Sequence, residues 1–250
     1  MVPELRYRAL VGYDGTDFLG YQIQAQGRTV QGEIETALKK VTQADIRIDG
    51  AGRTDAGVHA TGQVIAFNAS WKHSLVDFQR ALNALLPPDI VISELRPVEK
   101  TFHPRFGAVG RFYQYTIINQ PWPSVLERRY TYHVRDSLDL AAMNHASRFL
   151  VGTHDFASFG KPPQGENTVR QVMQADWSRT GNRLIFEIMA NAFLYRMVRT
   201  IVGTLVQVGL GQLTPPQLKD ILAQRDLTLS APPAPACGLC LVQVIYPENS

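Results

Sequence analysis

The sequence predicts an α+β protein built from two modules of the same kind. Some stretches alternate apolar and polar residues, as strands do, and others repeat apolar residues at helical spacing. The order strand, helix, strand, strand, helix, strand occurs in residues 1–105 and again in residues 106–250. This order is that of a split βαβ unit, in which helices cover one face of an antiparallel or mixed sheet. We therefore expect two ferredoxin-like modules related by a pseudo-twofold axis.

Each element of the first module has a local signal. Thr29 is suited to cap the first helix, and Pro87 and Pro88 stop the second. In chain order the expected elements are a strand at Leu5–Tyr13, a helix with Val30, Ile34, Leu38 and Val41 on one face, strands at Ile46–Ile48 and Val64–Phe67, a helix with Leu75, Phe78, Leu82 and Leu85 on one face, and a strand at Ile90–Leu95.

The second module follows a linker at 101–110 and carries one additional helix. A hairpin turn at 179–182 joins its two central strands. Its expected elements are a strand at Phe112–Ile118, a helix with Leu140, Met143, Ala146 and Leu150 on one face, strands at Val169–Trp177 and Leu184–Ala190, a long helix over Phe193–Val208, a short helix after Pro215 and Pro216, and a strand at Leu239–Tyr246.

The composition limits the class of protein. A chain of 250 residues with 45% hydrophobic residues can bury a core, and no apolar run approaches the roughly 20 residues of a membrane helix. The N-terminus lacks the apolar stretch of a secretory signal, so we expect a soluble, cytoplasmic protein with no membrane partner. Nineteen of the 25 basic residues are arginine, which suits phosphate and base recognition but is equally explained by codon bias.

The most informative stretch is the loop from Gly50 to Gln63, which lies between two expected strands. It contains four glycines and a single carboxylate, Asp55, with Arg53 and His59 nearby. Spacing alone favours a simple glycine-rich turn stabilised by an aspartate. That interpretation leaves the guanidinium and the imidazole unexplained, whereas a rigid loop that presents all three groups is typical of a reactive site.

The loop sequence GRTDAGVHATGQV resembles the tRNA pseudouridine synthase A family. The resemblance continues, in the family's order, through Tyr13–Thr16, Thr29–Glu33, Arg111–Tyr115, Gly152–Phe156 and Asn191–Arg199. One departure is Tyr21, where the family usually has tryptophan. The resemblance implies a fold in which the two halves meet at a central catalytic cleft.

The implied activity is the isomerisation of uridine to pseudouridine in tRNA, on the 3′ side of the anticodon stem-loop at positions 38, 39 or 40. The reaction breaks the bond between ribose C1′ and base N1 and rejoins the base through C5. It involves no redox change, so no cofactor and no metal are expected. Family members act as homodimers on tRNA, which implies the same two partners here.

The resemblance also assigns residues. Asp55 is the catalytic carboxylate, and whether it attacks C1′, attacks C6 or removes a ribose proton stays open. Arg199 is the arginine that pairs with it, Tyr113 is the aromatic that stacks on the target base, and Leu239 lines the base pocket. The remaining expected RNA contacts are Arg53, His59, His103 and Arg105.

Structural interpretations of these residues remain open. Arg199 could extend from an apolar helix to solvent, Tyr113 and Leu239 could be core residues, and His59 could be a buried structural histidine. Cys237 and Cys240 form a lone C-x-x-C without a second ligand pair, which disfavours a zinc site, and the prolines before it disfavour a redox helix.

Two other functions compete with the isomerase. One is an RNA-binding module or tRNA folding chaperone that has lost its catalytic residues. The presence of Asp55, Tyr113 and Arg199 argues against this function. The other is a hydrolase that uses Asp55, but glycoside hydrolysis needs two carboxylates and the loop contains one.

Overall fold

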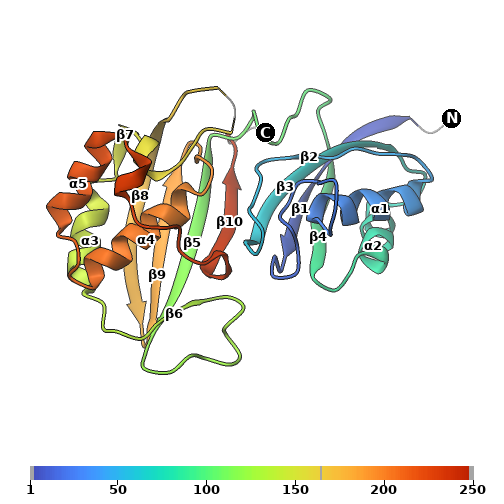
Figure 1. The fold of residues 1–250 in the computed structure, drawn as a ribbon. Helices are drawn as coiled ribbons and strands as arrows, with labels where there is room; N and C mark the ends of the chain where they lie inside the picture. The colour runs from blue at the N-terminus through green and yellow to red at the C-terminus, as the bar shows by residue number, and fades with distance from the viewer. Residues whose placement is uncertain (1–2, 164, 248–250) are drawn as a thin grey trace. The chain divides into compact units, whose positions relative to one another are not determined.

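The computed structural model describes residues 3–163 and 165–247, and these residues form two compact units (Figure 1). The first unit contains the described residues up to Val109 together with those from Leu241 onward, and the second runs from Gly110 to Cys240. The expected division at residue 105 stays a prediction, and residues 241–245 of the last strand group with the N-terminal unit. Both units combine strands with helices, so the predicted α+β class is confirmed.

The first unit has a strand order typical of a split βαβ module. Its strands follow the order β4-β1-β3, with the short β2 paired to β3, and every one of these pairings is antiparallel. In chain order the elements are β1 (Glu4–Tyr13), α1 (Val30–Thr42), β2 (Asp49–Gly50), β3 (His59–Ser70), α2 (Leu75–Leu85) and β4 (Ile90–Val98), and β10 (Leu239–Ile245) lies on the other side of β3.

The second unit has a mixed sheet. Its strands follow the order β5-β9-β8-β7 with antiparallel pairings, and β6 pairs with β5 in parallel. In chain order the elements are β5 (Gly110–Asn119), β6 (Tyr132–Val134), α3 (Leu140–Arg148), β7 (Gly152–Asp155), a 3-10 turn at Ala157–Phe159, β8 (Val169–Thr180), β9 (Arg183–Ala190), α4 (Met197–Gly209), α5 (Pro215–Gln224), and further 3-10 turns at Leu227–Leu229 and Ala236–Gly238.

Local signals in the sequence explain several element ends. The side chain of Thr29 accepts a hydrogen bond from the Gly32 N–H and caps α1, as predicted. Helix α2 ends before Pro87, and the β8–β9 hairpin turns at Gly181, whose φ is +62°. Strands β8 and β9 are both longer than the apolar runs that predicted them, because backbone pairing continues beyond the buried residues.

The predicted strand at Ile46–Ile48 is wrong, because only Asp49 and Gly50 pair with β3. Ile48 is buried, but its N–H donates to the carboxylate of Glu35 at 3.2 Å instead of to a neighbouring strand. A side chain from α1 therefore replaces the sheet hydrogen bond at this position.

The predicted start of the long helix at Phe193 is also wrong. Tyr195 forms a β-bridge with Lys161, and Arg196 has a left-handed backbone with φ +62°, so α4 begins at Met197. The short strands β6 and β7 were not predicted, because their three and four residues are too few to show a clear alternation.

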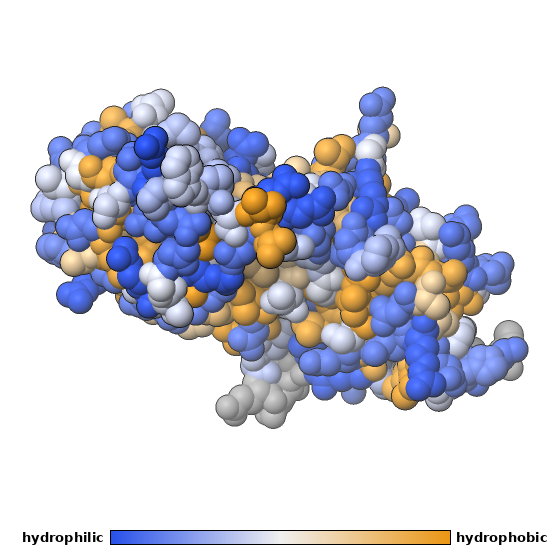
Figure 2. Space-filling view, turned by 90° about the horizontal axis from the view of Figure 1, so that it is seen from below, coloured by the Kyte–Doolittle hydropathy of each residue, from blue (hydrophilic) through white to orange (hydrophobic). Residues whose placement is uncertain are grey.

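The interior of each unit is hydrophobic, and its surface is mixed. Tyr7, Phe67 and Phe78 pack edge to face or tilted in the first core, and Trp177 lies against Phe186 in the second. Seen from below, the surface is mainly hydrophilic, with hydrophobic residues scattered between (Figure 2). Among the described residues, no helix has the length and hydrophobicity needed to span a membrane.

Candidate active site

Hydrogen bonds fix the loop at residues 51–58, between β2 and β3. The side chain of Gln63, fully buried in β3, donates to the carbonyl of Gly52 at 2.9 Å. Within the loop, the Val58 N–H donates to the Asp55 carbonyl at 3.1 Å and closes a tight turn. Asp55 is half-buried at the first position of this turn, so its backbone is held in one conformation.

Residues 13–21, which begin at the last residue of β1, hold the loop from its other side. The hydroxyls of Tyr13 and Thr54 are 2.8 Å apart, and the Tyr21 N–H donates to the Thr54 carbonyl at 3.1 Å. Thr54, the residue immediately before Asp55, is thus bonded through both its side chain and its backbone, and it is only 8% exposed. The catalytic candidate is therefore presented on a rigid support.

Two glycines allow residues 13–21 to approach the loop. A Cβ on Gly15 would overlap the backbone carbonyl of Val58, and a Cβ on Gly20 would lie 2.8 Å from the Thr54 carbonyl oxygen. Gly20 also has φ +98°, a conformation that side chains rarely adopt. This contact gives a structural reason for the glycines of residues 13–21, a segment in which the sequence resembles the family.

His59 is a buried residue that supports the same contact. It is 6% exposed, and its Nδ1 accepts a hydrogen bond from the Gly15 N–H at 3.0 Å. A carboxylate oxygen of Asp14 lies 3.2 Å from the same nitrogen. We consider this a contact and not an ion pair, because Nδ1 uses its lone pair to accept from Gly15 and the carboxylate accepts from Thr16. This geometry favours the structural alternative for His59.

The other RNA-contact candidates of the first unit are more accessible. Arg53 is exposed on the loop itself. His103 and Arg105 lie in the connection after β4, where Nδ1 of His103 accepts from the Arg105 N–H at 3.1 Å. The His103 ring packs on Phe106 at 4.4 Å, and the Arg105 guanidinium lies 5.6 Å from the centre of that ring. Phe106 is 76% exposed, so this connection presents an aromatic and basic surface to solvent.

In the second unit, Tyr113 lies on β5 and shares its buried face with Tyr115 and Ile117. This agrees with the predicted alternation of the strand, which places Phe112 and Gln114 on the opposite face. The Tyr113 ring packs edge to face on Phe193, with ring centres 5.1 Å apart. Its orientation is therefore fixed by a second aromatic ring from the segment before α4.

Arg199, in the first turn of α4, is tied to the proline-rich segment that precedes β10. Its Nε donates to the Ala234 carbonyl at 2.7 Å, and the Ala234 N–H donates to the Arg199 carbonyl at 2.9 Å. Burial raises the pKa of the Tyr115 hydroxyl and of the Cys237 thiol, and the positive charge of Arg199 opposes both shifts. The guanidinium therefore lies among buried groups, which disfavours the alternative that it extends to solvent.

Leu239 begins β10 and is 6% exposed. The preceding Gly238 lies against the Tyr115 ring, where a Cβ would come within 2.6 Å. The Tyr115 hydroxyl in turn donates to the Pro235 carbonyl at 2.7 Å. Leu239, Arg199 and Tyr115 thus belong to one packed region of the second unit.

Sequence reasoning missed two supporting residues in this unit. Asn191 uses its side-chain oxygen to accept from the N–H groups of Gln171 and Ala192, at 3.0 and 2.8 Å, and so shapes the chain between β9 and α4. Phe193 positions Tyr113. An asparagine directly after a strand is a typical backbone-bonding residue, so this signal was available in the sequence.

The substitution Tyr21→Phe provides a test of the packing behind the loop. The Tyr21 hydroxyl is buried against Gly50 and has no hydrogen-bond partner among the described residues, and burial raises its pKa well above the usual value. A buried hydroxyl without a partner is destabilising. We expect Tyr21→Phe to raise the free energy of unfolding by about 0.5–1 kcal/mol in urea melts. A loss of stability would mean that the hydroxyl has a partner.

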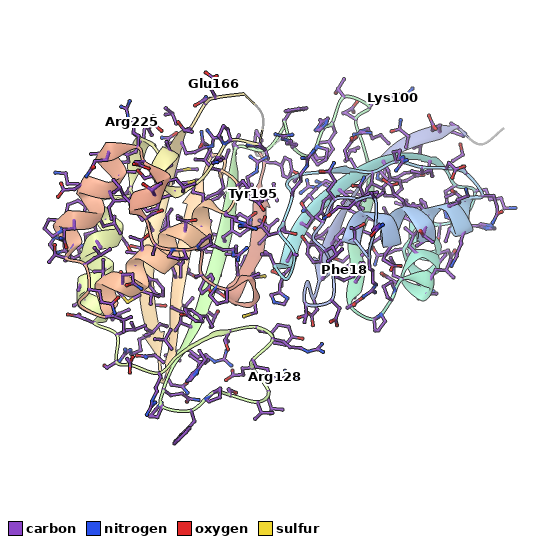
Figure 3. All side chains as sticks on the ribbon, viewed as in Figure 1. Phe18, Lys100, Arg128, Glu166, Tyr195 and Arg225 are labelled. Carbon is purple, nitrogen blue, oxygen red and sulfur yellow. The ribbon has the colours of Figure 1, made fainter. Side chains whose placement is uncertain are left out.

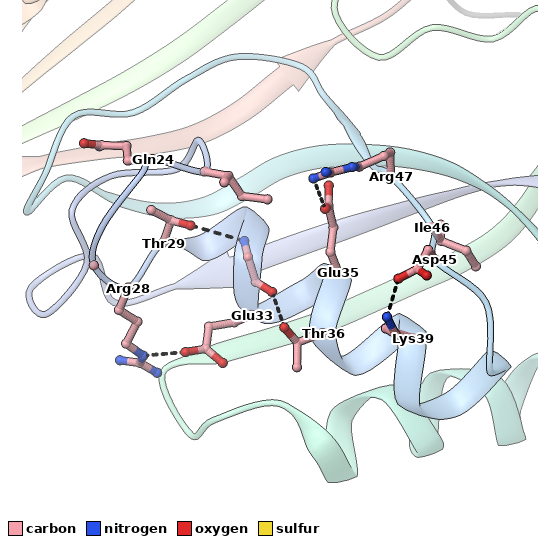
Figure 4. Close-up of a pocket in the computed structure, with 13 residues that line it drawn as sticks. Gln24, Arg28, Thr29, Glu33, Glu35, Thr36, Lys39, Asp45, Ile46 and Arg47 are labelled. Carbon is pink, nitrogen blue, oxygen red and sulfur yellow. Dashed lines mark hydrogen bonds and ion pairs between the residues drawn. The ribbon is translucent and has the colours of Figure 1, made fainter.

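A cavity of about 500 Å³ lies beside α1, away from the Asp55 loop (Figure 4). None of the predicted site residues lines it. Its charged side chains are paired with one another, through Arg28–Glu33 at 2.9 Å, Arg47–Glu35 at 2.8 Å and Lys39–Asp45 at 2.6 Å. We assign no ligand to a cavity whose charges are already neutralised.

The part of the chain that the structure describes contains no assembled set of metal ligands. No group of three or more His, Cys, Asp or Glu residues there could hold a metal ion. Cys237 and Cys240 form no disulfide bond, and the Cys237 thiol donates to the Thr131 carbonyl at 3.4 Å.

Comparison with known proteins shows the family of this chain. The family model described as tRNA pseudouridine synthase matches residues 9–107 and 146–247, so the chain belongs to that family of RNA-modifying isomerases. Its relatives named tRNA pseudouridine synthase A include those of Brevibacillus brevis, 45% identical over 96% of this chain and 99% of the relative, and Moorella thermoacetica, 45% identical over 94% and 97%. A third, from Chloroflexus aurantiacus, is 46% identical over 96% and 88%. The predicted family and enzyme class are confirmed.

Solved structures add little to this result. The structure titled "Structure of H/ACA RNP bound to a substrate RNA containing 2'-deoxyuridine" aligns at 12% identity over 80% of this chain and 44% of that chain. The TM-score of 0.36 is too low to support a conclusion.

Proposed function

We propose that this chain converts uridine to pseudouridine on the 3′ side of the anticodon stem-loop of tRNA, with Asp55 as the reacting carboxylate and without a cofactor. The observation that carries the proposal is the support of Asp55. Gly15 and Gly20 pack against its loop, and the side chains of Tyr13 and Gln63 hydrogen-bond to Thr54 and Gly52 within it. A reaction that cleaves and remakes one bond at a fixed ribose carbon needs a carboxylate held in place.

The other residues have binding roles in this proposal. Tyr113 stacks on the target base with the support of Phe193, and Arg199 and Leu239 contact the target nucleotide. Because a uridine stacked in a helix cannot react, the target has to leave the stem, and Arg53 is exposed where it could fill the vacated space. The exposed surface around His103 and Arg105 is suited to the RNA backbone.

The relatives named tRNA pseudouridine synthase A support tRNA as the substrate. We further propose that the chain acts in the cytoplasm as a homodimer. The RNA-binding alternative without catalysis is disfavoured, because Asp55, Tyr113 and Arg199 are all held by specific contacts or packing.

The test is incubation of the purified protein with an unmodified tRNA transcript, followed by nucleoside analysis. We expect pseudouridine to form in the absence of added cofactor, and to the same extent in the presence of a chelator. Stoichiometric tRNA binding without pseudouridine would favour the RNA-binding module, and release of free uracil would favour the hydrolase. Activity that is lost with chelator and restored by zinc would contradict the cofactor-free reaction.

A further inference from the structure

Tyr195 and Arg196 form an exposed pair where the chain enters α4 (Figure 3 labels Tyr195). Tyr195 is 52% exposed, and the Arg196 guanidinium lies over its ring, 4.9 Å from the centre. Two residues earlier, Phe193 packs on Tyr113. The exposed pair is therefore close to the aromatic residue that the proposed function places on the target base.

Lys161 lies directly beside this pair. It forms a β-bridge with Tyr195, whose N–H donates to the Lys161 carbonyl at 2.9 Å. Gly160 makes this approach possible, because a Cβ there would lie 2.6 Å from the Tyr195 carbonyl oxygen. The backbone thus holds an exposed lysine next to an exposed tyrosine and arginine, although the lysine is 34 positions away in the sequence.

The two cations are not neutralised by the protein. Neither Lys161 nor Arg196 forms an ion pair among the residues that the structure describes, whereas Arg183 pairs with Glu127 and Arg225 with Asp155 in the same unit. Unpaired cations that flank an exposed aromatic ring are typical of surfaces that bind a nucleic-acid strand. The cations contact phosphates, and the ring stacks on a base or holds the guanidinium.

The backbone of Arg196 is unusual and allows a test by substitution. It has φ +62° and ψ +6°, the left-handed conformation that glycine and asparagine adopt more easily than arginine. The fold therefore keeps an unfavourable residue at an exposed position where its side chain makes no ion pair. Arg225 has the same backbone conformation but pairs with Asp155, so among the described residues Arg196 is distinguished by its unpaired charge over an exposed aromatic ring.

We propose that Lys161, Tyr195 and Arg196 bind the RNA backbone next to the target uridine, with Arg196 and Lys161 on phosphates and Tyr195 holding the Arg196 guanidinium in place. This proposal rests on the proposed function, because it takes the location of the target base from Tyr113. It adds a strand-binding cluster, formed by these three residues, that the family resemblance does not assign.

The substitution Arg196→Gly separates binding from folding. Glycine suits the left-handed backbone, so we expect a melting temperature equal to or above that of the wild type. We expect the affinity for an unmodified tRNA transcript, measured by fluorescence anisotropy, to fall about 3- to 10-fold at 0.1 M salt. The slope of log affinity against log salt should decrease by about one, which is the loss of one phosphate contact. Arg196→Lys should retain part of the affinity and part of the salt slope. Lys161→Ala should lower both the affinity and the slope.

Arg225→Gly is the matched control. Arg225 is also exposed and left-handed, with φ +57°, but it pairs with Asp155 and lies far from Tyr195 within the same unit (Figure 3). The variant Arg225→Gly therefore loses the same charge and the same backbone strain as Arg196→Gly. We expect it to have wild-type affinity for tRNA and an unchanged salt slope.

Wild-type affinity and slope in Arg196→Gly would overturn the proposal, and so would an equal loss in Arg225→Gly, since any surface arginine would then have the same effect. Failure of the proposed function is seen separately, as wild-type protein that binds tRNA but forms no pseudouridine. In that case a loss confined to Arg196→Gly would still support the RNA contact.

Discussion

Asp55→Asn is expected to abolish pseudouridine formation and to leave the fold intact. The amide has nearly the same shape as the carboxylate and also suits a turn, so the hydrogen bonds of Thr54, Gln63 and Val58 around it should persist. It carries no negative charge and cannot serve as nucleophile or base. We expect the single-turnover rate on a tRNA transcript to fall by at least about a thousand-fold, as is typical when a reacting group is removed.

The control for this substitution is Asp45→Asn, which makes the same chemical change in the same unit. Asp45 is 83% exposed and pairs with Lys39 beside the α1 cavity, so wild-type activity is expected. The unfolding free energies of both variants and their affinities for tRNA complete the comparison. Turnover by Asp55→Asn within ten-fold of the wild type, with the fold and affinity unchanged, would remove Asp55 from the mechanism.

Gly15→Ala is expected to destabilise the support of the Asp55 loop strongly. The added Cβ would overlap the Val58 carbonyl, and a rigid backbone atom cannot move aside as a side chain can. Gly15 also donates its N–H to His59, so a shift of its backbone breaks that hydrogen bond as well. We expect a loss of about 2–3 kcal/mol in unfolding free energy, the range of overpacked interiors, together with a loss of activity.

Gly52→Ala is the matched control, because Gly52 lies in the Asp55 loop itself. A Cβ at Gly52 would meet no atom within 4 Å, and its backbone is not left-handed. We expect urea melts to show a change below about 0.5 kcal/mol, as for surface substitutions. If Gly15→Ala proves as harmless as Gly52→Ala, residues 13–21 do not hold the loop as the structure indicates.

Elements with strong local signals were predictable from the sequence. The helix capped by Thr29, the helix that ends before Pro87 and the hairpin at Gly181 follow from side-chain capping, the geometry of proline and the freedom of glycine. Each of these depends on residues that are neighbours in the chain. They needed no knowledge of the tertiary structure.

Features that depend on distant contacts were not predictable in this way. Ile48 fits a strand pattern, but the carboxylate of Glu35 takes the place of a strand partner. Tyr195 fits a helix pattern, but its pairing with Lys161 delays the start of α4. The grouping of residues from Leu241 onward with the first unit is of the same kind, because Gly62 has no side chain where the Val242 carbonyl approaches.

The candidate site was predictable through the resemblance and only partly through the residues themselves. The glycine-rich loop alone indicated a presented aspartate, but the supports of that loop, Gly15 and Tyr13, are recognised only in the structure. For His59, burial and the hydrogen bond from Gly15 favour a structural role that spacing could not distinguish from RNA binding. The roles of Tyr113, Arg199 and Leu239 toward the substrate stay predictions.

The position of the product in the tRNA tests the central claim most directly. Wild-type protein is incubated with transcripts that carry a single uridine at position 38, 39 or 40, and with a transcript that has cytidine at all three, and pseudouridine is then mapped along each RNA. We predict pseudouridine at the single anticodon-arm uridine in one or more of the first set, and none anywhere in the cytidine transcript. Pseudouridine that forms only outside the anticodon arm, or equal amounts in the cytidine transcript, would contradict the account.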